Sequence, residues 1–237
     1  MKKALTIALA VAMAGGTITV QAYEQGDWII RAGATMVDPD TDSDDINLPT
    51  GLVAKADVDD DTQFGFMPTY MITDTWAVEI LAATPFEHDI TAKGEGAIKG
   101  VNVPAGSTKH LPPTISVQWY PRGGKPGWQP YIGAGVNYTV FFDEDVDNDL
   151  KGLLGDLTGG VVDDADLDLD DSWGLAARAG VDIPFAENWA INLAVWYIDI
   201  DTEAVISAKS GGQTVDKVKF DVELDPWVYN VGIAYKF

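Results

Sequence analysis

The last eleven residues, Trp227-Val-Tyr-Asn-Val-Gly-Ile-Ala-Tyr-Lys-Phe237, decide the fold class. Every second residue from Trp227 to Phe237 is large and apolar, whereas the residues between them are mostly small or polar. A period of two indicates a strand with two different faces. Aromatic residues stand at both ends of the apolar face with aliphatic residues between them, which is typical of a strand that crosses a bilayer. For this segment alone, a strand of an ordinary water-soluble sandwich is the alternative.

The same alternation recurs in seven further segments. They span residues 28–37, 63–72, 76–83, 114–120, 132–140, 172–183 and 189–197. Together with the C-terminal strand they make eight, an even number that closes a barrel with both termini on one side. The sequence therefore predicts an all-β fold: an eight-stranded antiparallel transmembrane β-barrel of the outer-membrane type.

The connections between these segments alternate in length. Short ones lie near residues 73–75, 121–129 and 184–188, and long ones run over about 38–61, 88–110, 143–171 and 202–224. Outer-membrane barrels have short periplasmic turns and long extracellular loops, so the long connections are predicted to face outward. Because these connections are rich in aspartate, we expect solvated loops that tolerate disorder.

The N-terminal residues 1–22 read as a secretory signal peptide. Lys2 and Lys3 precede an apolar stretch, and small residues end the segment at Ala22. Removal of both lysines with this segment changes the formal net charge from −22 to −24. Such acidity argues against nucleic-acid partners, which require Lys and Arg. Residues 23–237 are then a single barrel domain with four long acidic extracellular loops, located in the bacterial outer membrane.

Several short strings along the chain are specific enough to indicate a family. They include Trp28-Ile-Ile-Arg31, Ala83-Thr-Pro-Phe86, Leu111-Pro-Pro-Thr114, Phe141-Phe-Asp-Glu144, Asp171-Ser-Trp-Gly174, Trp196-Tyr-Ile-Asp-Ile-Asp201 and Asp225-Pro-Trp-Val-Tyr229. Together they resemble the OmpW family of outer-membrane proteins over nearly the whole mature chain, with gaps in the loops. The resemblance implies an eight-stranded barrel with a hydrophobic passage, and it includes a relative linked to alkane uptake.

The resemblance also bears on partners. The aromatic C-terminus resembles the signal by which outer-membrane barrels are recognised for assembly, so the barrel-assembly machinery is an expected partner. Outer-membrane lipid, lipopolysaccharide and small hydrophobic solutes are the others.

Charged residues on the inward faces are predicted to meet in the periplasmic half of the barrel. An eight-stranded interior is only just wide enough for side chains, and buried charges need partners. A network of opposite charges at this depth would therefore close the lumen. The predicted periplasmic polar plug consists of Arg31, Glu79, Arg178, Asp182 and Lys236.

Apolar inward residues follow in the outer half. They predict an apolar cup above the polar floor, which serves as a hydrophobic passage, although simple filling of the barrel is the alternative role. The residues assigned to this passage are Met67, Leu81, Ala83, Phe141, Trp196 and Ile198.

Prolines mark a predicted sideways exit from the cup. Proline cannot donate a ladder hydrogen bond, and central strands normally exclude it. Pro85 ends one predicted strand and Pro113 begins the next, so we expect a lateral opening into the membrane between them. The alternative is that these prolines only mark bulges or the ends of loops.

The acidic loops contain one string that resembles a calcium-binding loop. Asp145, Asp147 and Asp149 have the required spacing, but Leu150 stands where the sharp turn requires glycine. We therefore expect no dedicated metal site.

The two histidines, His88 and His110, bound the second long loop and are expected to approach each other across a hairpin. With no third ligand in view they make a poor zinc site, and polar hairpin residues are the preferred interpretation. No set of nucleophile, base and orienting residue is present, so no catalytic residue and no cofactor is predicted.

The predicted function is passive uptake of small hydrophobic or amphipathic molecules, which enter the cup and leave laterally into the membrane. Three alternatives come from other classes. They are a structural or adhesive barrel with a filled lumen, a channel for small amino acids, and a barrel hydrolase or acyltransferase that would use His88 or His110.

Overall fold

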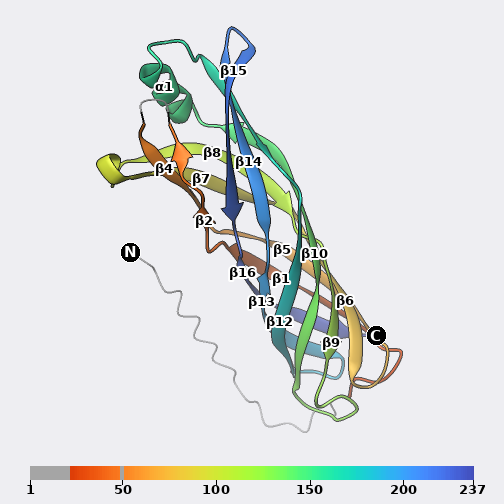
Figure 1. The fold of residues 1–237 in the computed structure, drawn as a ribbon. Helices are drawn as coiled ribbons and strands as arrows, with labels where there is room; N and C mark the ends of the chain where they lie inside the picture. Colours follow the sequence, from red (N-terminus) through yellow and green to blue (C-terminus); the bar gives the residue numbers. More distant parts are fainter. Residues whose placement is uncertain (1–21, 49–50) are drawn as a thin grey trace.

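The structure is a computed structural model that describes residues 22–48 and 51–237 (Figure 1). The predicted signal peptide, apart from Ala22, lies outside these residues. Strands dominate the described chain, and within it no helix is long and apolar enough to cross a membrane.

Eight antiparallel strands form a closed barrel. Going round the ring, the order is β12-β13-β16-β1-β5-β6-β9-β10, and β10 pairs with β12 to close it. Residue pairs from Gln129–Asp182 to Thr139–Ser172 make this closing seam. The strands are β1 (Trp28–Asp38), β5 (Asp61–Met71), β6 (Trp76–Ala83), β9 (Thr114–Trp119), β10 (Gln129–Val146), β12 (Ser172–Pro184), β13 (Trp189–Ile198) and β16 (Trp227–Lys236). The eight predicted strands and their order are thus confirmed.

The two faces of each barrel strand differ as the alternation predicts. In β16, Val228, Asn230 and Ala234 are buried, whereas Trp227 and Tyr229 are exposed. In a membrane barrel the exposed apolar face meets lipid, so its hydrophobic residues are buried by the bilayer and not by protein.

Aromatic contacts on the outer surface form two groups. Near the short turns, Trp28 packs on Tyr70 and Trp189 on Tyr235, with ring centroids 5.1 and 4.6 Å apart. At the opposite end of the barrel, ring contacts join Tyr138 on β10 to Trp173 on β12, and Tyr197 on β13 to Trp227 on β16. Such girdles mark the two interfaces of the membrane.

Beyond the outer girdle the barrel continues into a β-structured extension. One part adds β8 (Asn102–Leu111), β7 (Phe86–Glu95), β4 (Val53–Val58) and β3 (Ile46–Asn47) to the upper half of β10. The other part is a separate sheet of β11 (Asp164–Leu169), β14 (Asp201–Ser210), β15 (Gln213–Glu223) and β2 (Asp42–Ser43). A short 3₁₀ helix, η1 (Gly96–Ile98), and one α-helix, α1 (Asn148–Leu157), complete the extension, which lies opposite the short turns in Figure 1.

The expectation of solvated loops that tolerate disorder is therefore wrong for most of the long connections. Strands β11 and β14 show the reason. Ala165 and Ala204 are buried between the sheets, while the aspartates of β11 alternate with the inward residues. The period of two is present in these segments, but acidic residues occupy the outer face because it meets water instead of lipid.

The calcium-like string adopts a different structure. The Asp147 side chain caps α1 by accepting a hydrogen bond from the Asp149 N–H at 2.9 Å. An aspartate at this position satisfies free N–H groups of the first turn. The string therefore forms the beginning of a helix and not a calcium-binding loop. Leu150, at the position where a calcium loop needs glycine, is a buried residue of this helix.

Candidate functional site

The half of the barrel next to the short turns is filled by a layer of buried polar side chains, here called the polar layer. Its charged members are Arg31, Glu79, Arg178 and Asp182, all at most 5 % exposed. Arg31 Nη1 lies 2.9 Å from Glu79 Oε2, and Arg31 Nη2 lies 2.6 Å from Asp182 Oδ2. Arg178 pairs with the other oxygen of Glu79. Two cations and two anions thus balance one another inside the barrel, as burial of charge requires.

Lys236 lies apart from this cluster. Its Nζ lies 3.4 Å from a carboxylate oxygen of Asp27 and donates to the Ala22 carbonyl at 2.9 Å. Of the five residues assigned to the polar plug, the structure brings four together and places Lys236 near the N-terminal segment.

Three tyrosines belong to the polar layer although sequence reasoning did not assign them to it. Tyr23 donates to Asp182 at 2.9 Å, and Tyr120 accepts from Arg31 at 2.8 Å. Tyr131 accepts from Arg178 at 2.9 Å. The inward parity of Tyr120 and Tyr131 could have identified these two.

A glycine makes room for Tyr131. A Cβ atom at Gly180 would stand 2.4 Å from the Tyr131 ring carbon that carries the hydroxyl, far inside van der Waals contact. Position 180 must therefore lack a side chain for the tyrosine to reach the polar layer.

An apolar core lies directly above the polar layer. Met67, Leu81, Trp196 and Ile198 are buried in it, and Ala83 packs against it. The two regions meet where the Arg178 guanidinium lies over the Trp196 ring, 4.2 Å from its centroid. These five residues, all assigned to the hydrophobic passage, fill the barrel and are not among the residues that line the cavity described next.

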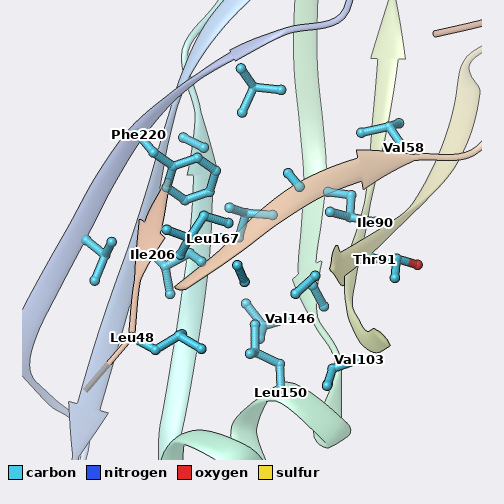
Figure 2. Close-up of a pocket in the computed structure, with 18 of the residues that line it drawn as sticks. Leu48, Val58, Ile90, Thr91, Val103, Val146, Leu150, Leu167, Ile206 and Phe220 are labelled. Carbon is cyan, nitrogen blue, oxygen red and sulfur yellow. The ribbon is translucent and has the colours of Figure 1, made fainter. Parts of the chain in front are cut away.

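The extension encloses a cavity of about 450 Å³. One wall is formed by β4, β7 and β8 and the other by β11, β14 and β15, with the leucines of α1 at the outer end (Figure 2). Labelled apolar side chains in Figure 2 include Val58 and Ile90 on the first wall and Ile206 and Phe220 on the second. Of the six residues assigned to the passage, Phe141 lines this cavity.

Polar groups are few in the cavity wall. Those present are Thr91, Thr108, Thr158, Thr202, His88, His110 and Asp216. A volume of this size with such a wall suits a small hydrophobic ligand.

The outer rim of the cavity carries exposed valines. Val101, Val161 and Val215 line the cavity and are also 51, 56 and 52 % exposed, so they mark a mouth that opens to solvent. Val101 precedes β8, Val161 lies between α1 and β11, and Val215 is near the start of β15.

Strand pairing is interrupted at the inner end of the cavity. The β6–β9 ladder ends at the pair Leu81–Thr114, and the β7–β8 ladder begins at Phe86–His110. Residues 82–85, at the junction of β6 and β7, and residues 111–113, at the junction of β8 and β9, lie between these two pairs and do not pair with each other. The structure thus places Pro85 and Pro113 on opposite sides of one interruption.

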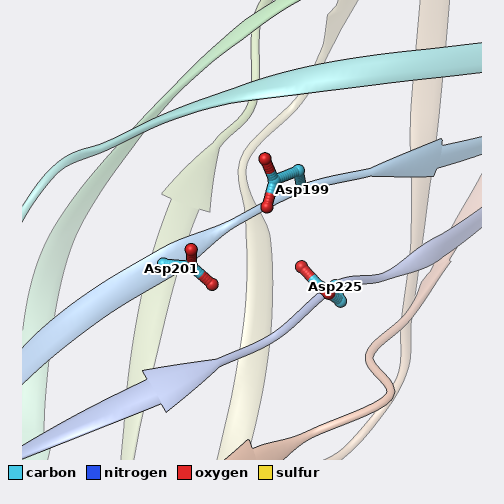
Figure 3. Close-up of side chains that lie close together, drawn as sticks. All are labelled: Asp199, Asp201 and Asp225. Atoms are coloured by element: carbon cyan, nitrogen blue, oxygen red, sulfur yellow. The ribbon is translucent and has the colours of Figure 1, made fainter.

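Three aspartates gather at the rim of the barrel, where β13 leads into β14 and the chain enters β16 (Figure 3). Oxygens of Asp199, Asp201 and Asp225 all lie within 4.8 Å of one another. Asp225 accepts hydrogen bonds from the Tyr197 hydroxyl at 2.7 Å and the Ile200 N–H at 3.2 Å. Burial and the neighbouring carboxylates raise the pKa of Asp201. Asp199 and Asp225 lie in the connections that lead into β14 and β16, and Asp201 is the first residue of β14, so the strand connections bring the three carboxylates together.

The closed barrel, its two aromatic girdles and its buried ion pairs define an outer-membrane β-barrel protein. The OmpW family profile matches residues 24–237, and the chain belongs to this family. The protein is therefore located in the outer membrane, where lipid surrounds the barrel.

Individual relatives extend this result. Outer membrane protein W of Vibrio cholerae is 40 % identical over 231 residues, which cover 97 % of each chain. The crystal structure of OprG from Pseudomonas aeruginosa matches with a TM-score of 0.76 and 44 % identity, covering 92 % of this chain and 99 % of that one. The dibenzothiophene metabolism operon protein PahQ of Pseudomonas aeruginosa is 27 % identical, with 90 % of each chain covered.

Proposed function

We propose that this protein is an outer-membrane channel for passive uptake of small hydrophobic or amphipathic molecules. The observation that carries the proposal is the apolar cavity, which opens to solvent at the three rim valines and ends at an interruption of the strand ladder. A solute would enter from outside, lose its water shell in the cavity and leave sideways into the bilayer.

The polar layer supports a sideways route. Its ion pairs and hydrogen bonds occupy the lumen beneath the apolar core, and to break one buried pair costs about 3–5 kcal/mol. An apolar solute offers no interaction to compensate that cost. Exit towards the periplasm through the barrel is thus far less favourable than movement into hydrocarbon.

The interruption between residues 82–85 and 111–113 is the proposed lateral opening. Proline removes backbone donors here, since neither Pro112 nor Pro113 carries an N–H. Pro113 still accepts hydrogen bonds from the Tyr138 N–H at 3.1 Å, so its strand stays attached to β10 while its other side has no partner. The opening lies beside Phe86, His110 and Phe141, of which the last two line the cavity.

The apolar wall favours hydrophobic solutes over small amino acids. A zwitterion would have to exchange its hydration for a wall almost without hydrogen-bonding groups, which is costly for charged groups. The name of the relative PahQ, which refers to dibenzothiophene metabolism, points to the same class of compound. Contacts with lipopolysaccharide, and assembly by the barrel-assembly machinery through the terminal Phe237, are part of the same proposal.

Uptake into vesicles whose outer leaflet is lipopolysaccharide tests the function. With the protein present, naphthalene should reach the membrane interior faster than in protein-free vesicles, whereas glycine and chloride should cross no faster. Glycine or chloride flux without any effect on naphthalene would contradict the proposal.

Substitution of Pro85 tests the lateral opening. Pro85→Val restores a backbone donor at the interruption, so uptake of naphthalene should fall while the barrel remains folded. Pro184→Val, at the periplasmic end of β12, is the matched control and should leave uptake unchanged. Unchanged uptake in Pro85→Val would place the exit elsewhere.

A further inference from the structure

Two buried histidines lie between the cavity and the proposed lateral opening. His88 and His110 are 3 and 2 % exposed, and both line the cavity. Their Nε2 atoms are 3.1 Å apart, and the second ring nitrogen of His88, Nδ1, lies 2.6 Å from the carbonyl oxygen of Asp59. The approach of these two side chains across the β7–β8 hairpin, predicted from the sequence, is confirmed.

The hydrogen bonds fix the proton on each ring. A carbonyl oxygen only accepts, so His88 Nδ1 carries a hydrogen and donates it to Asp59. In a neutral imidazole the other nitrogen is then an acceptor. His88 Nε2 must therefore receive its hydrogen bond from His110 Nε2, and His110 Nδ1 is left with a free lone pair.

That lone pair has no partner in the described residues. His110 Nδ1 is buried and makes no hydrogen bond. The nearby Asp61 cannot satisfy it, because this carboxylate only accepts hydrogen bonds, here from the N–H groups of Thr62 and Glu87 and from the Gln63 amide. A buried acceptor without a donor is unusual and destabilising, and it becomes satisfied if a ligand brings a donor.

Protonation does not supply the missing hydrogen at neutral pH. Burial, with a further contribution from the neighbouring His88, lowers the pKa of His110 to about 3. Burial also lowers the pKa of His88. The pair thus remains neutral in the physiological range and presents an acceptor instead of a cation.

We propose that His110 Nδ1 accepts a hydrogen bond from the hydroxyl group of a hydrophobic molecule in the cavity, so that the protein selects phenols and alcohols over hydrocarbons of similar shape. The proposal rests on the proposed function, because it concerns the same cavity. Phe141 stacks on the His110 ring with centroids 5.8 Å apart, and Phe86 packs edge-on at 5.6 Å. Phe141 and His110 both line the cavity, so these rings offer an aromatic surface next to the acceptor.

Equilibrium binding of two fluorescent compounds tests the inference. 1-Naphthol has a hydroxyl donor, whereas 1-methoxynaphthalene keeps the oxygen but has no donor. Binding is measured with the purified full-length barrel in detergent micelles, and the signal of protein-free micelles is subtracted. The protein should bind 1-naphthol about tenfold more tightly than 1-methoxynaphthalene, which is the range of one net hydrogen bond.

Two variants locate the preference. His110→Phe keeps a flat ring but removes the acceptor, and it should abolish the preference while 1-methoxynaphthalene binding stays within about twofold. His110→Gln keeps an acceptor oxygen and should restore part of the preference. Heat-modifiable migration on gels reports whether each variant is folded.

The outcomes separate the two proposals. Equal binding of both compounds by the unsubstituted protein, or a preference that persists in His110→Phe, overturns the role of His110 and leaves the channel intact. Failure of both compounds to bind the unsubstituted protein contradicts the proposed function, and with it the inference about selectivity.

Discussion

The interior of this protein is built in two contrasting ways along one axis. In the half of the barrel next to the short turns, Arg31 alone makes hydrogen bonds to Thr69, Glu79, Tyr120 and Asp182, and the lumen is occupied. In the extension, side chains from two sheets stop short of one another and leave an apolar cavity. The comparison teaches that the two regions differ in how their inward side chains pack: paired charges fill the barrel, whereas incomplete apolar packing in the extension leaves the cavity that we propose as the binding site.

The largest expected effect comes from breaking the closed region. Arg31→Met leaves Glu79 and Asp182 without their shared cation, so unfolding free energy should fall by about 3–5 kcal/mol. Urea unfolding in lipid vesicles measures it. Lys55→Ala removes an exposed pair with Asp42 and should leave the unfolding free energy nearly unchanged, because water screens this pair. Similar losses in both variants would show that the polar layer is not a tightly coupled cluster.

The extension should instead respond to pH through its buried histidines. The pKa of His110 is about 3 in the folded protein and about 6.5 in an unfolded chain. As pH falls below about 6.5 the unfolded chain gains a proton that the folded protein does not, so stability decreases by about 1.4 kcal/mol per pH unit. The loss is about 2 kcal/mol at pH 5 and vanishes above pH 7.

Melting temperatures at pH 7.5 and pH 5 check this sign. The drop between the two values should be smaller in His110→Phe than in the unsubstituted protein. The hydrogen bonds that Asp61 accepts lower its pKa, so its protonation reduces stability only at a pH below this range. It therefore does not contribute to the difference between pH 7.5 and pH 5. Equal drops in the two proteins would show that His110 does take up a proton when folded.

A substitution that fills the cavity tests the role of the extension, as Arg31→Met tests the polar layer. Ala204 faces the cavity from β14, and Ala204→Trp should lower hydrophobic uptake about tenfold, equivalent to ~1.4 kcal/mol. Val205 points away from the cavity on the same strand, so Val205→Trp is the matched control. Vesicle uptake of naphthalene measures both. Normal uptake in Ala204→Trp would remove the cavity from the path.

The barrel was readable from the sequence because lipid imposes an apolar outer face on every strand. The extension was not, because water on its outer face permits Asp164, Asp166 and Asp168 between the inward residues, and the mean composition then resembles a solvated loop. The four charged members of the polar layer could be predicted, because the alternation of residues shows which side chains point inward and the strand direction gives their depth in the barrel. Tyr23 did not, because it lies before the first strand and reaches Asp182 only through the folded N-terminal segment.

The cavity itself lies further out than the sequence predicts. Parity placed Trp196 and Ile198 inside correctly, but it gives no measure of whether inward side chains meet across the lumen. In the narrow barrel they do meet, and in the wider extension they do not. Whether an inward side chain fills the interior or lines a cavity depends on the separation of the two sheets. That separation is set by long-range strand pairing, which the alternation of residues does not reveal.

The path of an apolar molecule tests the account most directly. A short diazirine-bearing alkane, photoactivated with the protein in lipid vesicles and mapped by mass spectrometry, labels the residues that it contacts. The account predicts labels on the cavity wall and on residues 82–85 and 111–113, with none on the inward residues of the polar layer. Labels on Glu79, Asp182 and Tyr23 would show passage through the barrel towards the periplasm and would contradict it.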